Sequence, residues 1–265
     1  MLKIFYRYCP HKNHAPRPKW FSKKMCFISF IRSYDFFIKS KLNCACIPIL
    51  AIDRHNELTG SEKKWFYEVS RKYNFEILEL EKNSNCLSYL EVFKLALNFH
   101  DDTAILFAED DYLWRKDSIF ELYFAINNLP ADYITPYDHP VRYDNFFPEP
   151  DFIHWETKIF LSYHHHFRPQ ESTCMTYIST SKVLKEDKEI HKMFSGTNQK
   201  CPNDRELFRS LQHLGRHIDQ KHKKRLLLGP LPSLATHAHL PYLAPVVDWH
   251  NEVKKVKRFK LTQCI

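Results

Sequence analysis

The sequence predicts an α/β protein with a mostly parallel central sheet, and three observations carry this prediction. Apolar segments of strand length alternate with segments of helical period through the first half of the chain. The apolar segment 103–108 has the character of a buried strand and leads directly into Glu109, Asp110 and Asp111. The second half is less regular, with a stretch at 137–168 rich in Pro, His, Asp and aromatic residues. We therefore expect a three-layer α/β/α sandwich with a loop-rich second half.

The first half contains four predicted strands and three predicted helices. The segment 22–37 illustrates the helix prediction, because Phe27, Phe30 and Tyr34 are spaced so that they lie on one face of a helix. The predicted strands are 3–7, 46–52, 75–80 and 103–108, and the predicted helices are 22–37, 62–73 and 85–98. This order of strands and helices is typical of parallel strands joined by crossover helices.

The second half has weaker patterns. Its predicted helices are 116–127, 181–193 and 205–214, and its predicted strands are 132–135, 173–179, 226–228 and 234–237. The chain has no internal repeat and no clean linker, so we expect one domain over 1–265. Within it we distinguish a regular part at 1–115, a loop-rich part at 116–245 and a basic tail at 246–265.

Length and composition point to a globular cytoplasmic protein. The 265 residues are 44% hydrophobic, which is enough for a sizeable core, and no apolar run approaches the length of a membrane span. The N-terminal segment lacks the apolar region of a secretory signal and reads as a first strand. The eight cysteines show no CxxC spacing, which favours reduced thiols over a disulfide framework or a zinc site.

The formal charge of +8 leaves several partners open. Much of the excess lies in two separate runs, 221–225 and 254–260, whereas a nucleic-acid-binding protein is expected to have one contiguous basic face with interleaved aromatic residues. We therefore expect no nucleic-acid partner, although a non-enzymatic nucleic-acid-binding protein remains an alternative. The basic tail allows a peripheral membrane contact. Only four glycines are present, which disfavours glycine-rich phosphate loops.

The acidic triplet at 109–111 is the strongest candidate for a functional site. Ligands of open α/β sheets bind at the carboxyl ends of strands. Side chains alternate along a strand, so we expect Glu109 and Asp111 on one side and Asp110 on the other. Converging carboxylates suit a divalent cation, whereas a solvated acidic loop is the alternative.

Further along the chain, Asn203-Asp204-Arg205-Glu206-Leu207 opens a predicted helix and Thr236-His237 ends a predicted strand. Together with the strand and the Glu109-Asp110-Asp111 triplet, these residues resemble the GT-A-type glycosyltransferases, close to family-2-like members. The resemblance covers about residues 1–240 and implies a GT-A-like fold with a DXD-type motif. The triplet departs from that motif, because its first acid is a glutamate.

The resemblance implies a metal-dependent transferase that moves a sugar from a nucleoside-diphosphate sugar to a glycan hydroxyl, with inversion. Residues 1–115 would bind the nucleotide sugar and 116–245 the acceptor. Asp111, Glu109 and His237 would hold Mn²⁺ or Mg²⁺, which stabilises the departing diphosphate. Asp204 would act as the base that takes the proton of the acceptor hydroxyl.

The same resemblance assigns further contacts. Arg7, Asp53, Asn85, Glu109 and Asp110 would contact the nucleotide. The acceptor would lie against Tyr137, Asp138 and Trp155, because sugar rings stack on aromatic side chains.

Each assignment has a structural alternative. Asp204 could only stabilise the start of its helix, since acids are favoured there, and His237 could be an ordinary hydrogen-bonded histidine. The run His164-His165-His166 is better explained as a loop than as a metal site, because adjacent residues cannot all converge on one ion. The same acids could also serve a metal-dependent phosphohydrolase or nucleotidyltransferase, although no second acidic strand end suggests a two-metal site.

Overall fold

The structure, a computed structural model, describes residues 1–11, 15–40, 42, 44–143, 158–196, 201–214 and 222–261. Its centre is a nine-stranded sheet with the order β3-β2-β1-β4-β9-β6-β10-β8-β7. The strands are β1 (Leu2–Tyr8), β2 (Cys46–Asp53), β3 (Glu76–Leu80), β4 (Ala104–Glu109), β6 (Tyr133–Ile134), β7 (Phe160–Leu161), β8 (His166–Pro169), β9 (Tyr177–Thr180) and β10 (Leu227–Leu231). Within this sheet β8 and β9 run against the direction of the other strands, so the predicted, mostly parallel sheet is confirmed.

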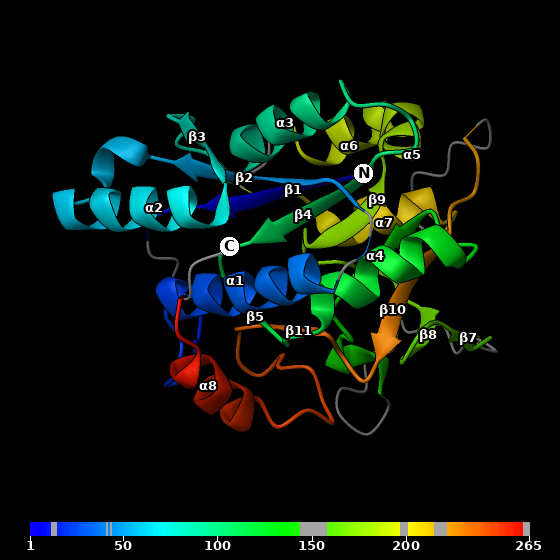
Figure 1. Ribbon diagram of the computed structural model, residues 1–265. Helices are drawn as coiled ribbons and strands as arrows, with labels where there is room; N and C mark the ends of the chain where they lie inside the picture. Colours follow the sequence, from blue (N-terminus) through cyan, green and yellow to red (C-terminus); the bar gives the residue numbers. More distant parts are fainter. Residues whose placement is uncertain are drawn as a thin grey trace.

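Helices cover both faces of the sheet and complete the predicted three layers (Figure 1). The helices α1, α2, α4 and α8 pack on one face, and α3, α5, α6 and α7 pack on the other. Their bounds are α1 (Lys23–Lys39), α2 (Gly60–Tyr73), α3 (Asn85–Ala96), α4 (Ser118–Asn128), α5 (Ser181–Glu186), α6 (Lys188–Phe194), α7 (Asp204–Leu211) and α8 (Trp249–Arg258). Two short 3-10 helices, η1 (His55–Glu57) and η2 (Pro140–Arg142), lie in connections.

The alternation of side chains along the buried strands explains why there are two cores. Every residue of β1 is buried, and its even-numbered side chains, such as Tyr6, pack against Phe27 and Phe30 of α1. Its odd-numbered Phe5 faces the other layer and stacks on Phe107 of β4. A strand buried on both faces reads as a continuous apolar run, which is why the strand prediction succeeded.

The element boundaries differ from the predictions in two instructive places. The single helix predicted at 181–193 is two helices, because the backbone of Asp187 leaves the helical conformation between α5 and α6. Part of the predicted basic tail forms α8, which buries Trp249, Val253 and Val256. Arg32 of α1 pairs with Glu252 of α8 at 2.7 Å and fixes this helix on the core.

A second, two-stranded sheet was not predicted, and it shapes the site. It joins β5 (Tyr112–Trp114) to β11 (Ala235–His237) in antiparallel pairing, with His237 opposite Tyr112. Asp111 directly precedes β5, so this pairing brings His237 beside the acidic triplet. None of the helices in the described ranges is both long and apolar enough to cross a bilayer.

Candidate functional site

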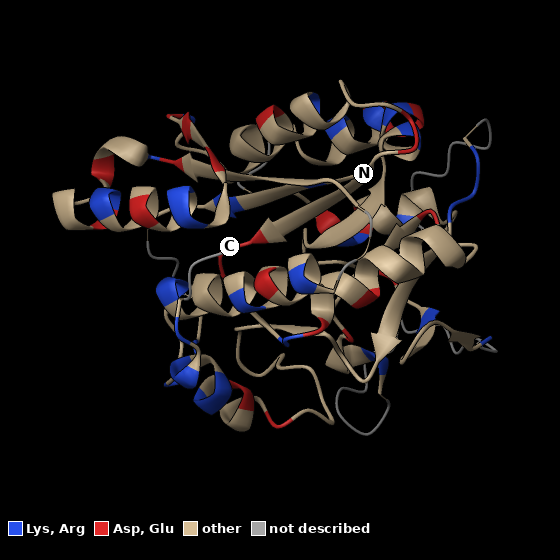
Figure 2. Cartoon of the chain, in the orientation of Figure 1, with Lys and Arg blue, Asp and Glu red and all other residues tan. Residues whose placement is uncertain are grey.

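A cavity of about 470 Å³ opens at the carboxyl ends of β1, β2 and β4 and at the start of α3. The chain leaves β1 toward β2 on one side, whereas β4 lies on the other side of β1. This is a topological switch point, where the connections diverge and leave a crevice for a ligand. In Figure 2 the carboxyl end of β4, which lies at this edge of the sheet, is red because it carries acidic residues.

All three acids of the triplet line the cavity. The strand ends at Glu109, and Asp110 and Asp111 form a turn before β5. Because the extended backbone stops at Glu109, the alternation expected from strand geometry does not continue. All three carboxylates, including that of Asp110, therefore border the same cavity.

Each of these carboxylates is paired with a cation from the N-terminal part of the chain. Arg7 lies beside Glu109 at 2.9 Å, a contact set by the direct register of these two residues in parallel strands. Lys23, in the first turn of α1, contacts Asp110 at 2.9 Å, and Arg17 contacts Asp111 at 2.9 Å. The backbone N–H of Cys9 also donates to Asp110 at 2.8 Å.

Crowding and burial change the acidity of the triplet. Burial raises the pKa of Glu109 to about 7, an effect that Arg7 opposes and that Asp111 and Asp110 reinforce. Burial also raises the pKa of Asp110, with Lys23 opposing it. Burial acts in the same sense on Asp111, but His237 and Arg17 outweigh it and hold the pKa of Asp111 below its usual value. Of the three acids, Asp111 is the one whose surroundings lower its pKa and favour the ionised form.

Asp111 has one oxygen engaged and one without a protein donor. Its Oδ2 accepts from Arg17 and lies 3.0 Å from Nε2 of His237, and the pKa of His237, which burial lowers, is raised overall by Asp111. Its Oδ1 is buried and has no hydrogen-bond partner among the described residues. A buried carboxylate oxygen left without a donor is costly unless another group meets it.

This donor set fits a magnesium-like ion bound together with phosphates. Within the described ranges no three His, Cys, Asp or Glu side chains are arranged to hold a metal by themselves. Mg²⁺ does not need such a cage, because it is usually bound by one or two carboxylates plus substrate phosphates. Asp111 offers the unpaired oxygen, and the neighbouring acids supply further hard oxygen ligands. The metal remains a prediction on this basis.

The start of α3 forms the opposite wall of the cavity. Arg7 donates to the carbonyl oxygen of Asn85 at 2.9 Å and also to its side-chain oxygen. Ser84 caps the helix and lines the cavity together with Asn85. A helix N-terminus with a neighbouring guanidinium is a favourable place for an anion.

Asp53 lines the same cavity but has a local structural role. Its Oδ1 accepts from the backbone N–H groups of Arg54, Lys82 and Asn83, at 3.0, 2.8 and 3.3 Å. These bonds tie the end of β2 to the loop that precedes α3. The structure thus places Arg7, Asp53, Asn85 and the triplet around one cavity, and their predicted contact with a nucleotide stays a prediction.

Asp204 lies at the start of α7, and its carboxylate does not line the cavity. It accepts from the backbone N–H groups of Thr173, Cys174 and Met175, at 3.0, 2.9 and 3.0 Å. The hydroxyl groups of Ser172 and Thr173 donate to it as well. Cys174 and Met175 have positive φ angles of 45° and 59°, so Asp204 holds a loop in an unusual backbone conformation.

The predicted acceptor residues lie elsewhere. Tyr137 and Asp138 are almost completely buried, and neither lines the cavity. Asp138 pairs with Arg168 at 2.8 Å and accepts from Gln170 at 3.1 Å. Trp155 falls outside the described residues.

Sequence reasoning missed the two cations Arg17 and Lys23. A signal for them existed, because the segment after β1 is rich in basic residues and Lys23 follows Ser22, the cap of α1. The run His164-His165-His166 is explained by a buried acid instead of a metal. His164 lies 2.7 Å from Glu121 and His165 lies 3.6 Å from the same side chain.

No protein-family model and no curated protein matches the sequence. Among solved structures, the chain is similar to a cytidylyltransferase from Leptospira borgpetersenii, with 12% identity, a TM-score of 0.35 and coverage of 71% of this chain and 64% of that one. It is also similar to the inositol-1-phosphate CTP transferase from T. maritima (11% identity, TM-score 0.42, coverage 97% and 96%). A third is the Francisella tularensis 2-C-methyl-D-erythritol 4-phosphate cytidylyltransferase (7% identity, TM-score 0.43, coverage 97% and 99%).

These comparisons contradict the predicted sugar transfer, because all three proteins are named as cytidylyl- or CTP transferases. The chain spans less than two thirds of the Leptospira protein. The prediction of a glycosyltransferase with Asp204 as base is therefore corrected. The site gives a physical reason as well, since the carboxylate of Asp204 is surrounded by donors from the segment 173–175.

Proposed function

We propose that the cavity binds a nucleoside triphosphate together with a divalent cation, and that the protein transfers the nucleotidyl group to an acceptor. One observation carries this proposal: three carboxylates line a crevice at the switch point of the sheet, and each of them is paired with a lysine or arginine side chain. A metal–polyphosphate complex has the complementary pattern, with a cation for the carboxylates and anions for the basic side chains.

When such a complex binds, each charged side chain of the site would exchange its present ion-pair partner for a group of the ligand, and no charge would be left unpaired. The phosphates would take Arg7 and Lys23, and the cation would take the carboxylates that these side chains now neutralise. An empty site with only acids would suffer strong mutual repulsion, and a site with only bases would leave the cation unsupported. The ion pairs of the free protein keep both sets of groups in position until the ligand arrives.

The side chains then have distinct tasks. Asp111 would hold the cation. The bound cation would neutralise the negative charge that develops on the departing pyrophosphate. Arg7 and the start of α3 would orient the phosphates, and Lys23 would balance the charge on their other side. The loop anchored by Asp204 would keep Thr176 against the triplet, because the backbone N–H of Glu109 donates to the hydroxyl of Thr176 at 3.2 Å.

Binding is tested first, by calorimetry with CTP, UTP, ATP and GTP, each with and without Mg²⁺. We expect one triphosphate to bind with a strong requirement for the cation. Asp111→Asn should weaken this binding at least 100-fold, the size of about 3 kcal/mol for a lost charged ligand. Asp102→Asn is the matched control, because Asp102 lies fully outside the cavity at the other end of β4 and is exposed.

Chemistry is tested second, by measuring the release of pyrophosphate and of phosphate with candidate acceptors. Pyrophosphate released only when an acceptor is present supports nucleotidyl transfer. Phosphate released from the nucleotide alone would make the protein a phosphohydrolase. Equal nucleotide affinities for the Asp111→Asn and Asp102→Asn variants would overturn the proposal that the nucleotide and its cation bind in this cavity.

A further inference from the structure

A second concave region lies between α1, the connection from β5 to α4, and the C-terminal part of α8. It is a groove of about 990 Å³, and it shares no lining residue with the nucleotide cavity. Lys23 and Lys39 are the two ends of α1, so the α1 residues of the groove begin well away from the cavity. At 1.5 Å per residue, Arg32, the first α1 residue of the groove, is about 14 Å along the helix from Lys23.

The groove is strongly basic. Among the described residues, seven lysine and arginine side chains line it against three acids, which leaves an excess of four positive charges. The cations are Arg32, Lys39, Arg115, Lys116, Lys255, Arg258 and Lys260. The acids Asp35, Asp117 and Glu252 are all in ion pairs with members of this set.

Three cations remain over after these pairs are formed. Lys116, Arg258 and Lys260 have no ion pair with any described residue, although they come from two segments far apart in the sequence. Figure 2 shows basic residues along α8, and Lys254 and Lys257 of this helix are exposed. The positive surface is therefore wider than one small anion requires.

The aromatic residues of the groove separate possible partners. Nucleic acids need exposed rings on which bases stack, but Phe36 and Phe259, the two aromatic residues that line the groove, are only partly exposed. The ring of Phe36 packs against Phe120 at 6.1 Å and lies under Lys116 at 4.9 Å. Ile38, next to Lys39, is 38% exposed. Cations with a small apolar component suit the interface of a membrane better than a polynucleotide.

The attachment of α8 limits how a membrane could be bound. Trp249, Val253 and Val256 form its apolar side and are already buried in the core. This helix therefore has no apolar face to insert into the acyl region, and contact must be electrostatic.

We propose that the groove and the outer side of α8 dock the protein on a membrane surface rich in anionic phospholipids. The phosphate groups of the lipids would meet Lys116, Arg258 and Lys260, the cations that the protein leaves without carboxylate partners. The proposal is independent of nucleotidyl transfer, because the groove and the cavity share no lining residue.

The test is flotation with vesicles of phosphatidylcholine, with and without phosphatidylglycerol, using the full chain. We expect binding only to the anionic vesicles and loss of binding as salt rises from about 0.1 to 1 M, which shortens the screening length from about 10 to 3 Å. The triple variant Lys116→Glu, Arg258→Glu, Lys260→Glu should bind at least 100-fold more weakly. A matched control, Lys64→Glu, Lys94→Glu, Lys182→Glu, changes the net charge equally at exposed positions on other helices.

Two results would overturn the proposal. The first is an absence of binding to anionic vesicles by the unmodified chain, including the case in which only inorganic polyphosphate or a single-stranded oligonucleotide binds. The second is an equal loss in both triple variants, which would mean a general charge effect. Calorimetry of the same variants with nucleotide and Mg²⁺ keeps this test separate, since the groove variant is expected to retain nucleotide binding.

Discussion

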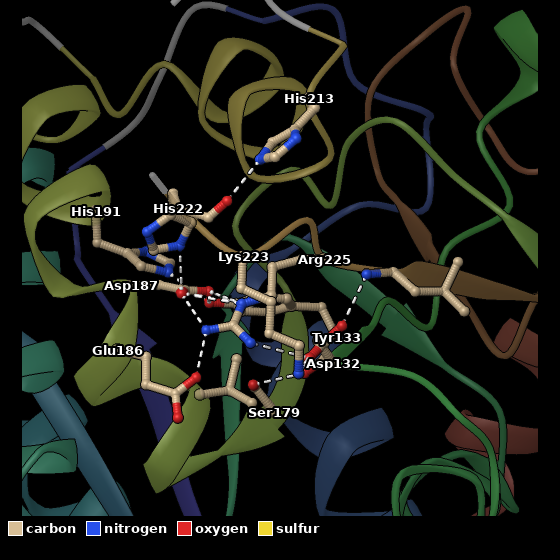
Figure 3. Close-up of polar contacts among 12 residues, drawn as sticks. Asp132, Tyr133, Ser179, Glu186, Asp187, His191, His213, His222, Lys223 and Arg225 are labelled. Carbon is tan, nitrogen blue, oxygen red and sulfur yellow. Dashed lines mark hydrogen bonds and ion pairs between the residues drawn. The ribbon is translucent and has the colours of Figure 1, made fainter. Parts of the chain in front are cut away.

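Two regions of the molecule contain the same three residue types and use them differently. At the cavity, Asp111 is paired with Arg17 and His237. In the second half of the chain, Asp187 is paired with Arg225 at 2.6 Å and with His222 at 2.7 Å (Figure 3).

The two aspartates differ in how completely their oxygens are engaged. Asp187 is fully buried, its Oδ1 accepts from Arg225, and its Oδ2 accepts from Arg225 and from the hydroxyl of Tyr133 at 2.6 Å. Asp111 borders a cavity and keeps one oxygen without a donor among the described residues. Composition alone therefore does not distinguish a structural ion pair from a ligand site. These two aspartates differ in the number of oxygens left without a donor among the described residues.

The largest effect on stability is expected from Arg225→Met. Arg225 also reaches Glu186 at 2.7 Å and Asp132 at 3.2 Å, so its loss leaves a buried carboxylate without its cation. We expect the free energy of unfolding to fall by about 3–5 kcal/mol, measured by urea denaturation. Arg225→Lys keeps the charge but loses the forked arrangement of donors. Its free energy of unfolding should therefore lie between those of the unmodified protein and of Arg225→Met. A loss below about 1 kcal/mol would mean that this network does not hold the fold.

A smaller loss of stability is expected from Asp204→Asn. The substitution turns one acceptor oxygen into a donor that faces the N–H groups of Thr173, Cys174 and Met175. The expected cost is about 2 kcal/mol in urea denaturation, because donors that were satisfied become unpaired. Glu206→Gln, on the same helix start, should cost much less. An unchanged stability of Asp204→Asn would return this residue to the candidates for a chemical role.

The elements that the sequence predicted well are those whose burial is periodic. The helix predicted at 22–37 is α1, and Ser22 accepts a hydrogen bond from Met25 as its cap. The break at Asp187 was missed because the apolar pattern continues through it, and the reason for the break is a set of partners distant in the sequence. The strand β5 was missed because it is only three residues long and its partner β11 lies more than a hundred residues later.

The site was predicted where strand ends and parallel register determine it. Arg7 and Glu109 end neighbouring strands, so their proximity follows from the sheet. The sequence shows a basic segment after β1, but it does not show that Arg17 and Lys23 pair with Asp111 and Asp110. The donors around Asp204 depend on the positive φ angles of Cys174 and Met175, and residues of these types rarely adopt that conformation.

The next effect depends on pH and concerns His191, inside the buried network. Nδ1 of His191 lies 2.8 Å from the hydroxyl of Tyr89, and Nε2 lies 3.1 Å from that of Tyr133. Burial lowers the pKa of His191 to about 3, and His222 adds to the effect. Below pH 6.5 the unfolded chain therefore binds a proton that the folded protein excludes, and stability falls as the pH falls toward 3.

The size of this dependence is about 1.4 kcal/mol per pH unit below about pH 6.5. It is isolated by comparing the protein with His191→Gln, in which the group does not titrate. The difference between their unfolding free energies should shrink as the pH is lowered from about 6.5 to 4.5. If this difference stayed constant over the range, His191 would take up its proton as readily in the folded protein as in the unfolded chain, and its pKa would not be lowered.

The smallest effect on stability is expected at the cavity, from Lys23→Met. Asp110 keeps the N–H of Cys9, and since its pKa is already raised it can take up a proton when Lys23 is removed. The free energy of unfolding should therefore change by about 1 kcal/mol or less, whereas affinity for a nucleotide with Mg²⁺ should fall about 10- to 100-fold. Lys24→Met is the control, because Lys24 is the next residue and lies over Trp65 at 4.6 Å, outside the cavity. If Lys23→Met lost several kcal/mol of stability and no affinity for the nucleotide, the acidic triplet would have a structural role, as the ion pairs of Asp187 do.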